Sequence, residues 1–424
     1  MTTTIVGVAT GTPDGGVAVV RLSGTQARTI AEAVGGPVGP PRRLVRRALR
    51  LGDAVEDGLM VWMPGPGSFT GEDVVELHVH AGARNVRAVV ERLIEGGAVA
   101  AEAGEFTRRA FNNGRLGLDQ AEGIAALIAA QTDAGLEQAR RLVAGELGRE
   151  VEGLCAEIRE LRCEVEANLD FPEDVAAADL KRWAGEISGV VESLERWVRE
   201  FEAGRRGRER TRVVLAGPPN AGKSSIFNNL LGRERAIVSP VPGTTRDFVE
   251  AEFNYGGLEA TLVDTAGLRE PTDVVEAEGV RRSRGQVDGA DLVLWIEGAD
   301  QEVGEPPDGD VICVENKRDI GRRREGWVGA TASEVGVGEL KAALAEWHAG
   351  RQAQPWIGLA RHRDRVAECR DALLRVELGG ALEVVAFELG VAERRLAEIT
   401  GRGQLGPIGE SVLRDIFSRF CIGK

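Results

Sequence analysis

The chain has 424 residues, enough for two to four domains of about 100–200 residues each. Its 53 basic and 67 acidic side chains give a net charge of −14, and a field of that sign repels phosphate at long range. A nucleic-acid partner must therefore meet a local basic patch or be delivered by another protein. The hydrophobic content of 43% excludes wholesale disorder.

Neither membrane insertion nor a disulfide-stapled fold is indicated. No apolar run approaches the ~20 residues that cross a bilayer, and Met1–Thr4 lacks the basic-then-apolar order of a signal peptide. The five cysteines form no CxxC pair, and their odd number fits no closed set of disulfides. We therefore expect a reduced, cytoplasmic protein without a membrane partner.

The first region, residues 1–115, mixes predicted strands and helices and ends before a change of texture. Its turn signals are glycine- and proline-rich, such as Pro64–Gly67. The pattern predicts an α+β domain, with strands over Thr4–Val8, Val17–Leu22 and Gly58–Met63 and helices over Thr25–Val34 and Asn85–Ile94.

A helical texture fills residues 116–205 and returns over residues 347–424. Between Leu116 and Asp170 there is no proline, and apolar residues recur three and four positions apart. The segment between them, residues 206–346, alternates apolar strands with helical stretches, which predicts a mostly parallel sheet covered on both faces. We therefore predict a multidomain α/β protein in which an α-helical domain carries an inserted domain.

A phosphate-binding loop follows the first strand of the inserted segment. Residues Gly217–Ser224 match GxxxxGK[ST], in which glycines let successive backbone N–H groups face a phosphate at a helix N-terminus. Lys223 is expected to bridge the β- and γ-phosphates, and the Ser224 hydroxyl to ligate Mg²⁺. This loop alone is equally typical of an ATPase.

Two further motifs favour guanine. Asp264 begins an Asp-Thr-Ala-Gly sequence after an apolar strand, where it is expected to hold Mg²⁺ through water while the Gly267 N–H senses the γ-phosphate. Residues Asn316–Asp319 read Asn-Lys-Arg-Asp and follow a later strand. A carboxylate there accepts from the N1–H and N2–H₂ groups of guanine, a donor pair that adenine lacks. The three motifs in this order predict GTP binding.

Two more segments are weaker. Thr245, in Gly-Thr-Thr-Arg-Asp over Gly243–Asp247, is typical of the second Mg²⁺ ligand of a switch loop that the γ-phosphate orders. Thr331–Ser333 stands where a guanine-clamping loop is expected, with the usual Ser-Ala order replaced.

The hydrolytic water must be positioned without the glutamine that Ras-type proteins place after the DxxG glycine, because Leu268 stands there. The pattern does not choose among four acidic candidates downstream: Glu270, Asp273, Glu276 and Glu278.

The charge that stabilises the transition state also has alternative sources. Arg246 and Arg269 are candidates within the chain. Alternatively, oxygen atoms of Asn220 and of the loop Ser239–Thr244 could surround a monovalent cation. Potassium is the cation that suits a cage of that size. The alternative for Asn220 is a cap on the following helix.

These motifs and their flanks resemble the tRNA-modification GTPases that act at the wobble uridine, known as the MnmE or TrmE family. The resemblance covers nearly the whole chain. It is carried by Gly15–Gly24, Ser68–Leu77, Gly104–Phe111, Leu118–Glu122 and the terminal Cys-Ile-Gly-Lys of Cys421–Lys424.

The resemblance implies a homodimer whose N-terminal domain is akin to tetrahydrofolate-binding folds, and a potassium-activated GTPase domain inserted in the helical domain. In such proteins 5-formyltetrahydrofolate or a related folate binds the N-terminal domain. With an FAD-dependent partner protein, the one-carbon unit reaches C5 of the tRNA wobble uridine, giving a carboxymethylaminomethyl or aminomethyl group.

Carried onto this chain, the resemblance implies that Glu276 is the catalytic acid. The implied Mg²⁺ ligands are Ser224 and Thr245. The implied K⁺ ligands are Asn220, Ser239, Val241 through its carbonyl, and Thr244. The implied folate contacts are Arg21, Glu76, Arg115 and Lys424. The full set of expected GTP contacts is Asn220, Ala221, Gly222, Lys223, Ser224, Ser225, Ser239, Thr244, Thr245, Asp264, Thr265, Ala266, Gly267, Asn316, Lys317, Asp319, Thr331 and Ala332.

Other readings stay open. A ribosome-associated GTPase of the Era or EngA kind would share the G-domain motifs, although the C-terminal part shows no GXXG loop of an RNA-binding KH module. A non-catalytic switch is the other alternative. Cys421 is either a nucleophile or a packing residue. The arginines of 42–50 and of 205–212 either meet tRNA phosphates or form solvated faces.

Overall fold

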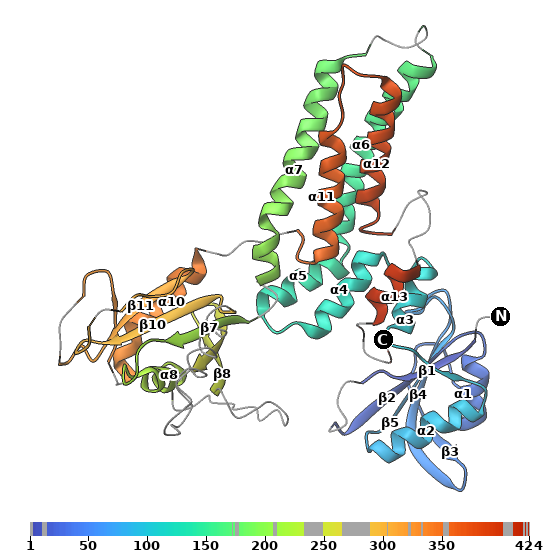
Figure 1. Ribbon diagram of the computed structural model, residues 1–424. Helices are drawn as coiled ribbons and strands as arrows, with labels where there is room; N and C mark the ends of the chain where they lie inside the picture. Colours follow the sequence, from blue (N-terminus) through green and yellow to red (C-terminus); the bar gives the residue numbers. More distant parts are fainter. Residues whose placement is uncertain are drawn as a thin grey trace, which may run out of the picture. The chain divides into compact units, whose positions relative to one another are not determined.

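The computed structural model describes residues 3–10, 15–171, 173, 178–206, 210–232, 249–264, 289–302, 304–320, 324–331, 334–350, 356–401, 410–418, 420 and 423. The chain forms two compact units (Figure 1). The first comprises residues 1–129, 137–198 and 360–424, and the second comprises 130–136 and 199–359. Within the described ranges, no helix combines the length and apolarity needed to cross a membrane.

An N-terminal sheet begins the first unit, with strand order β3-β4-β5-β2-β1-β6. Its strands are β1 (Ile5–Val8), β2 (Val17–Ser23), β3 (Val45–Leu51), β4 (Ala54–Met63), β5 (Val74–His80) and β6 (Val99–Ala100). Helices α1 (Ala27–Gly35) and α2 (Ala83–Glu95) pack on one face and share its core. Because side chains alternate along a strand, Val20 and Leu77 enter this core while Arg21 and Glu76 lie on the opposite face. The predicted α+β domain is confirmed.

Helices form the remainder of the first unit's framework. They are α3 (Glu105–Asn112), α4 (Leu118–Ala129), α5 (Asp133–Val143), α6 (Glu146–Asp170), α7 (Leu180–Arg206), α11 (Ala360–Leu374), α12 (Leu382–Ala397) and α13 (Glu410–Ser418). The first turn of α5, through Leu136, and the end of α7, from Arg199, belong to the second unit. On α6, Val151, Cys155 and Ile158 are buried at helical spacing. Figure 1 shows α6, α7, α11 and α12 lying side by side, so helices before and after the inserted segment build one bundle.

The C-terminal end of the chain packs against the N-terminal part of the first unit. Phe417 and Phe420 form an apolar cluster with Leu118 and Ala121 of α4, and Phe111 of α3 packs against it. A methyl group on Gly104 would lie only 2.6 Å from the Phe417 carbonyl oxygen, so glycine permits this close approach.

The second unit is built on a sheet of order β12-β11-β10-β7-β9-β8. Its elements are β7 (Thr211–Ala216), α8 (Lys223–Leu231), β8 (Val249–Tyr255), β9 (Leu258–Asp264), β10 (Leu292–Gly298), β11 (Val311–Asn316), β12 (Val328–Gly329), the 3₁₀ helix η1 (Glu334–Val337) and α10 (Gly338–Ala349). All neighbouring strands are parallel except the β8–β9 hairpin. The predicted mostly parallel sheet is confirmed, and its carboxyl ends share one edge.

Candidate functional site

The phosphate-binding loop joins β7 to α8 and depends on two glycines. Gly217 has φ +138°, and a methyl group there would lie 2.0 Å from the Ile296 carbonyl oxygen. Gly222 has φ +91°, and a methyl group there would lie 2.2 Å from Asn316 Nδ2. Only glycine combines these backbone angles with such close neighbours. Gly222 is also the N-cap of α8, and no side chain caps that helix end, so its N–H groups stay available to an anion.

Lys223 opens α8 and folds back over the loop. Its Nζ donates to the carbonyl oxygens of Gly217 at 2.9 Å and Pro218 at 2.8 Å. Burial lowers the pKa of Lys223, while the nearby Asp264 carboxylate acts to raise it. A phosphate in the loop would replace neutral acceptors with charged ones, and hydrogen bonds between charged partners are stronger.

Asp264 ends β9 at the same sheet edge. It is only 3% exposed and lies in register with Leu215 on β7, directly before the phosphate loop. Ser224 and Ser225 are exposed at the first turn of α8. A carboxylate and a hydroxyl are the oxygen donors that Mg²⁺ prefers, so the side chains of Asp264 and Ser224 suit this ion.

Asn316, at the end of β11, begins the segment Asn316–Asp319, which we call the base-reading motif, and joins it to the phosphate loop. Its Nδ2 donates to the Ala221 carbonyl oxygen at 2.8 Å, and the residue is 1% exposed. Lys317 has φ +60° and pairs with Asp300 at 3.1 Å. Asp319 follows in the same turn and is exposed.

The Asn220 side chain is exposed, and its backbone has φ +59°. Because α8 has Gly222 as its N-cap and no capping side chain, the alternative in which Asn220 caps that helix is wrong. Thr331, after β12, donates its N–H to the Gly336 carbonyl oxygen at 3.1 Å. The expected site residues that lie outside the described residues are Ser239, Val241, Thr244, Thr245, Thr265, Ala266, Gly267, Glu276, Ala332 and Lys424.

A second candidate site lies on the face of the N-terminal sheet away from α1 and α2. Arg21 and Glu76 stand opposite each other in register on β2 and β5 and form an ion pair at 2.8 Å. The Arg21 guanidinium lies 5.8 Å from the ring centre of Phe69 and 5.7 Å from that of Phe106. His78 Nε2 approaches the same carboxylate at 3.6 Å. The face therefore combines ionic groups with aromatic walls.

The C-terminal segment reaches this second site. A methyl group on Gly423 would lie 1.9 Å from the Val8 carbonyl oxygen, and one on Gly7 would lie 3.1 Å from both Phe106 and Gly423. Gly423 and Phe106 thus both lie against Gly7 of β1, and Phe106 borders Arg21. Arg115 is exposed, and its Cγ lies 3.3 Å from a methyl group built on Gly71.

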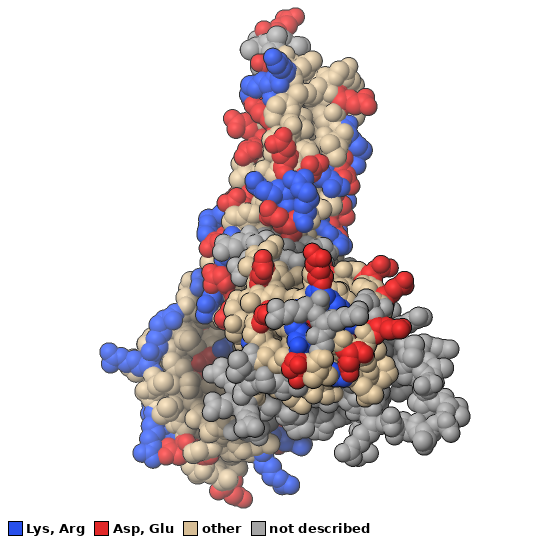
Figure 2. Space-filling model, turned by 90° about the vertical axis from the view of Figure 1, so that its left-hand side faces the viewer, with Lys and Arg blue, Asp and Glu red and all other residues tan. Residues whose placement is uncertain are grey.

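The arginines of 42–50 lie on and before β3, an edge strand of the N-terminal sheet. Arg46 pairs with Asp57, and the Arg47 Nε donates to the Pro37 carbonyl oxygen at 2.7 Å. Figure 2 shows Lys and Arg interspersed with Asp and Glu over the described residues of the face that it presents.

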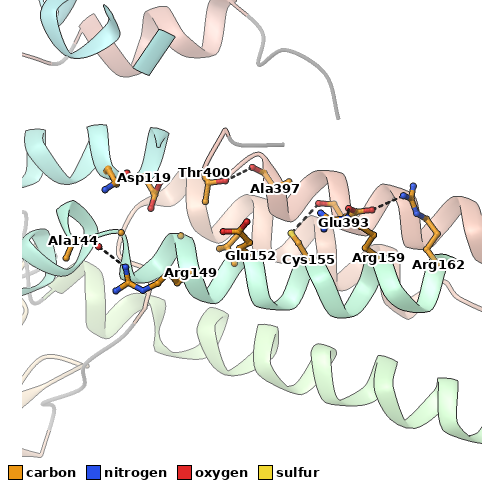
Figure 3. A pocket seen from close by; sticks show the side chains of 14 residues that line it. Asp119, Ala144, Arg149, Glu152, Cys155, Arg159, Arg162, Glu393, Ala397 and Thr400 are labelled. Carbon is orange, nitrogen blue, oxygen red and sulfur yellow. Dashed lines mark hydrogen bonds and ion pairs between the residues drawn. The ribbon is translucent and has the colours of Figure 1, made fainter. Parts of the chain in front are cut away.

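The helical bundle contains a cavity of about 570 Å³ between α6 and the end of α12 (Figure 3). Glu393, 1% exposed, accepts from Arg159 at 2.6 Å and pairs with Arg162 at 3.3 Å. Burial raises the pKa of the Cys155 thiol on its wall to about 12, and the Glu393 carboxylate adds to that effect. The buried Glu393 carboxylate in this cavity therefore has its compensating cations within the protein.

Two buried carboxylates near the base-reading motif were not anticipated. Glu297 and Glu315 are both 0% exposed, and each comes near the end of a strand that is otherwise apolar. A glutamate within such a strand is the signal that could have identified them, since buried carboxylates need a compensating charge.

Comparison with protein families agrees with this architecture. The family described as GTP-binding protein TrmE N-terminus matches residues 4–115, and the family described as MnmE helical domain matches residues 118–421. Among solved structures, the chain is similar to the G domain of the FeoB iron transporter of T. maritima, with 24% identity, coverage of 33% of this chain and 99% of that chain, and a TM-score of 0.25.

Curated relatives match along their whole length. The tRNA modification GTPase MnmE of Halorhodospira halophila is 43% identical over 455 residues, which span 99% of this chain and 96% of that protein. The tRNA modification GTPase MnmE of Maricaulis maris is 40% identical over 445 residues, and the alignment covers 100% of this chain and 100% of that protein. The chain therefore belongs to the MnmE family of tRNA modification GTPases.

Proposed function

We propose that this GTPase is activated by potassium and acts at C5 of the tRNA wobble uridine. With an FAD-dependent partner, it adds a carboxymethylaminomethyl or aminomethyl group from a tetrahydrofolate-borne one-carbon unit. In this proposal residues 1–115 bind folate and form the homodimer, residues 206–346 bind GTP, and residues 116–205 and 347–424 form the helical domain. The names of the curated relatives, tRNA modification GTPase MnmE, support the choice of substrate.

The hydrogen bond from Asn316 Nδ2 to the Ala221 carbonyl oxygen carries the proposal for GTP. It couples the motif that reads guanine to the loop that holds phosphate, so base and phosphates are recognised by one rigid arrangement. Asp319 is then the acceptor for N1–H and N2–H₂ of guanine, and Lys223 the partner of the β- and γ-phosphates.

The proposed role of potassium rests on Asn220. The side chain of Asn220 is exposed, its backbone is left-handed, and the N-cap of α8 is Gly222, which supports an amide oxygen that is available to a cation. An alkali cation prefers such oxygen ligands. We propose that Ser239, Val241 and Thr244 supply the others, that Thr245 joins Ser224 on Mg²⁺, and that Glu276 orients the attacking water.

The proposed folate site uses the ionic pair of the N-terminal sheet. The Glu76 carboxylate suits a ring that offers paired N–H donors, and the aromatic rings of Phe69 and Phe106 beside Arg21 suit a flat heterocycle. Gly423 lies against Val8, and Lys424 is the next residue, so its charge suits the carboxylates of the glutamate tail. Arg115 is proposed as a further cation for the same ligand.

GTP turnover in potassium and in sodium, at equal ionic strength, tests the GTPase part of the proposal. Potassium should stimulate the rate strongly, and Glu276→Ala should abolish the stimulated rate. Asn220→Ala should remove the difference between the two salts. Equal rates of the unmodified chain in both salts would refute the cation mechanism and direct attention to Arg246 and Arg269.

Titration of the full chain with 5-formyltetrahydrofolate tests the second site. Glu76→Gln and Arg21→Met should each weaken binding about tenfold or more, because each leaves a charged partner unpaired. Arg46→Met is the matched control, since it removes an exposed ion pair with Asp57 on the β3–β4 hairpin. The folate assignment is wrong if Glu76→Gln and Arg46→Met bind alike.

A further inference from the structure

Two like charges lie side by side in the core of the second unit. The parallel strands β10 and β11 are in register so that Glu297 stands opposite Glu315, and both residues are 0% exposed. Adjacent buried carboxylates repel each other and lose their hydration, so they need compensating cations close by.

Arg324 supplies the first cation. It donates to Glu297 at 2.7 Å, and its Nε lies 3.7 Å from Glu315. The same guanidinium donates to the carbonyl oxygens of Gln301 at 2.7 Å and Gly298 at 3.3 Å, and its backbone N–H donates to Glu315 at 3.1 Å. The Arg324 side chain is only 12% exposed, so little water competes for these contacts.

Arg318 supplies the second cation, and it lies inside the base-reading motif. Its three nitrogens donate to Glu315 at 3.2 Å, to Glu339 at 3.1 Å and to the Trp327 carbonyl oxygen at 2.7 Å. The guanidinium also covers Gly329 on β12, where a methyl group would lie 2.0 Å from Arg318 Nη1. The planar guanidinium of Arg318 thus connects the base-reading motif to β12 and to the start of α10.

We call Glu297, Glu315, Arg318 and Arg324 the charge cluster. It is connected to the phosphate loop as well as to the base-reading motif. Gln301, whose carbonyl oxygen accepts from Arg324, donates through its side chain to the Pro219 carbonyl oxygen at 2.9 Å. Its side-chain oxygen accepts from the Gly298 N–H at 2.9 Å. The cluster therefore contacts the base-reading motif directly and the phosphate loop through Gln301.

We propose that the arginines of the charge cluster are positioning residues for guanine selectivity. They hold the turn Asn316–Asp319 at a fixed position against β12, so that the Asp319 carboxylate meets both guanine donors at once. This inference rests on the proposed function, because it takes Asp319 as the group that reads the base. Arg318 contacts no nucleotide in this account and acts only through the turn.

Competition between GDP and inosine diphosphate tests the proposal in the full-length protein. Inosine diphosphate has the same phosphates and ribose but lacks the N2 amino group, so the ratio of the two affinities reports the position of Asp319. Arg318→Lys keeps the positive charge but loses the planar guanidinium that donates to three acceptors at once. It should lower GDP affinity about tenfold and reduce the preference for GDP over inosine diphosphate by a similar factor.

Two further variants make the result decisive. The double variant Glu315→Gln with Arg318→Gln removes both charges together, so no buried charge is left uncompensated, and it should reduce the preference as Arg318→Lys does. Arg212→Lys is the matched control, because Arg212 is the second residue of β7 and pairs at 3.0 Å with Glu250 of β8, outside the charge cluster. Thermal unfolding midpoints above the assay temperature exclude a trivial loss of fold.

Each outcome has one meaning. A reduced preference in both cluster variants and an unchanged one in Arg212→Lys supports the inference. A preference that stays within twofold in both cluster variants overturns it and leaves the proposed function standing. An unmodified chain that does not prefer GDP to inosine diphosphate overturns the proposed reading of guanine itself, and the inference with it.

Discussion

Replacing Glu122 by glutamine should loosen the junction between the two sequence halves of the helical bundle. Glu122 on α4 accepts from Arg361 at 2.6 and 2.7 Å and lies 2.8 Å from His362 Nε2, both at the start of α11. Arg361 also donates to the carbonyl oxygens of Glu398 and Ile399 at 2.8 Å. The carboxylate thus joins two helices on either side of the inserted unit, since Glu122 and Arg361 are 239 positions apart in the sequence.

The size of the effect follows from the pKa of Glu122. Burial alone would raise that pKa, but the charges and hydrogen bonds of His362 and Arg361 lower it from 4.5 to about 2. A lowered pKa stabilises the folded state above the unfolded-state value near 4.5, by about 3 kcal/mol at neutral pH. That contribution should decline as the pH falls from 4.5 towards 2, where the folded protein also takes up the proton.

Amide hydrogen exchange of the full chain, followed by mass spectrometry on peptides from α4 and α11, measures this prediction. At pH 7, Glu122→Gln should speed exchange in both helices by about a hundredfold, the factor that corresponds to about 3 kcal/mol of local opening. Glu137→Gln on α5, an exposed glutamate paired with Arg140 at 3.7 Å, is the control and should change nothing. A change below threefold in Glu122→Gln would refute the reasoning.

Two other perturbations have clear expected outcomes. Gly222→Ala should abolish binding of a fluorescent GDP analogue, because the new methyl group would lie 2.2 Å from Asn316 Nδ2; affinity within threefold of the unmodified chain would contradict this. A thiol reagent at pH 8 should label the exposed Cys163 before the buried Cys155 and Cys369, because burial raises the pKa of Cys155 to about 12 and also raises that of Cys369. Peptide mapping of the labelled sites checks the order, and early labelling of Cys155 would show that it is not buried.

Local patterns predicted the phosphate loop, the α+β character of the N-terminal region and the mostly parallel sheet of the inserted segment. The glycines of Gly217–Ser224 follow from what a backbone needs to surround a phosphate, and the structure has them at positive φ. Alternation along β5 likewise separates Leu77, in the core, from Glu76, on the open face. These features depend on neighbours in sequence, so the sequence is sufficient to find them.

Long-range pairing could not be predicted in the same way. The contact of Glu122 with Arg361, and that of Glu297 with Glu315 and Arg324, depend on strand register and helix packing across the chain. A charge in an apolar segment indicates that a partner exists but does not identify it. The expected folate contacts came from the family resemblance and not from a local pattern. Arg21 and Glu76 lie together because β2 and β5 are neighbours in the sheet.

The central claim is that Asp319 reads guanine beside the phosphate loop that Asn316 contacts. The measurement that tests it most directly is the affinity of Asp319→Asn for GDP and for xanthosine diphosphate, whose base carries a carbonyl where guanine carries the N2 amino group. The account predicts that GDP binding falls at least tenfold while xanthosine diphosphate binding rises, since an amide can donate to that carbonyl. Unchanged GDP affinity with no gain for xanthosine diphosphate would contradict it.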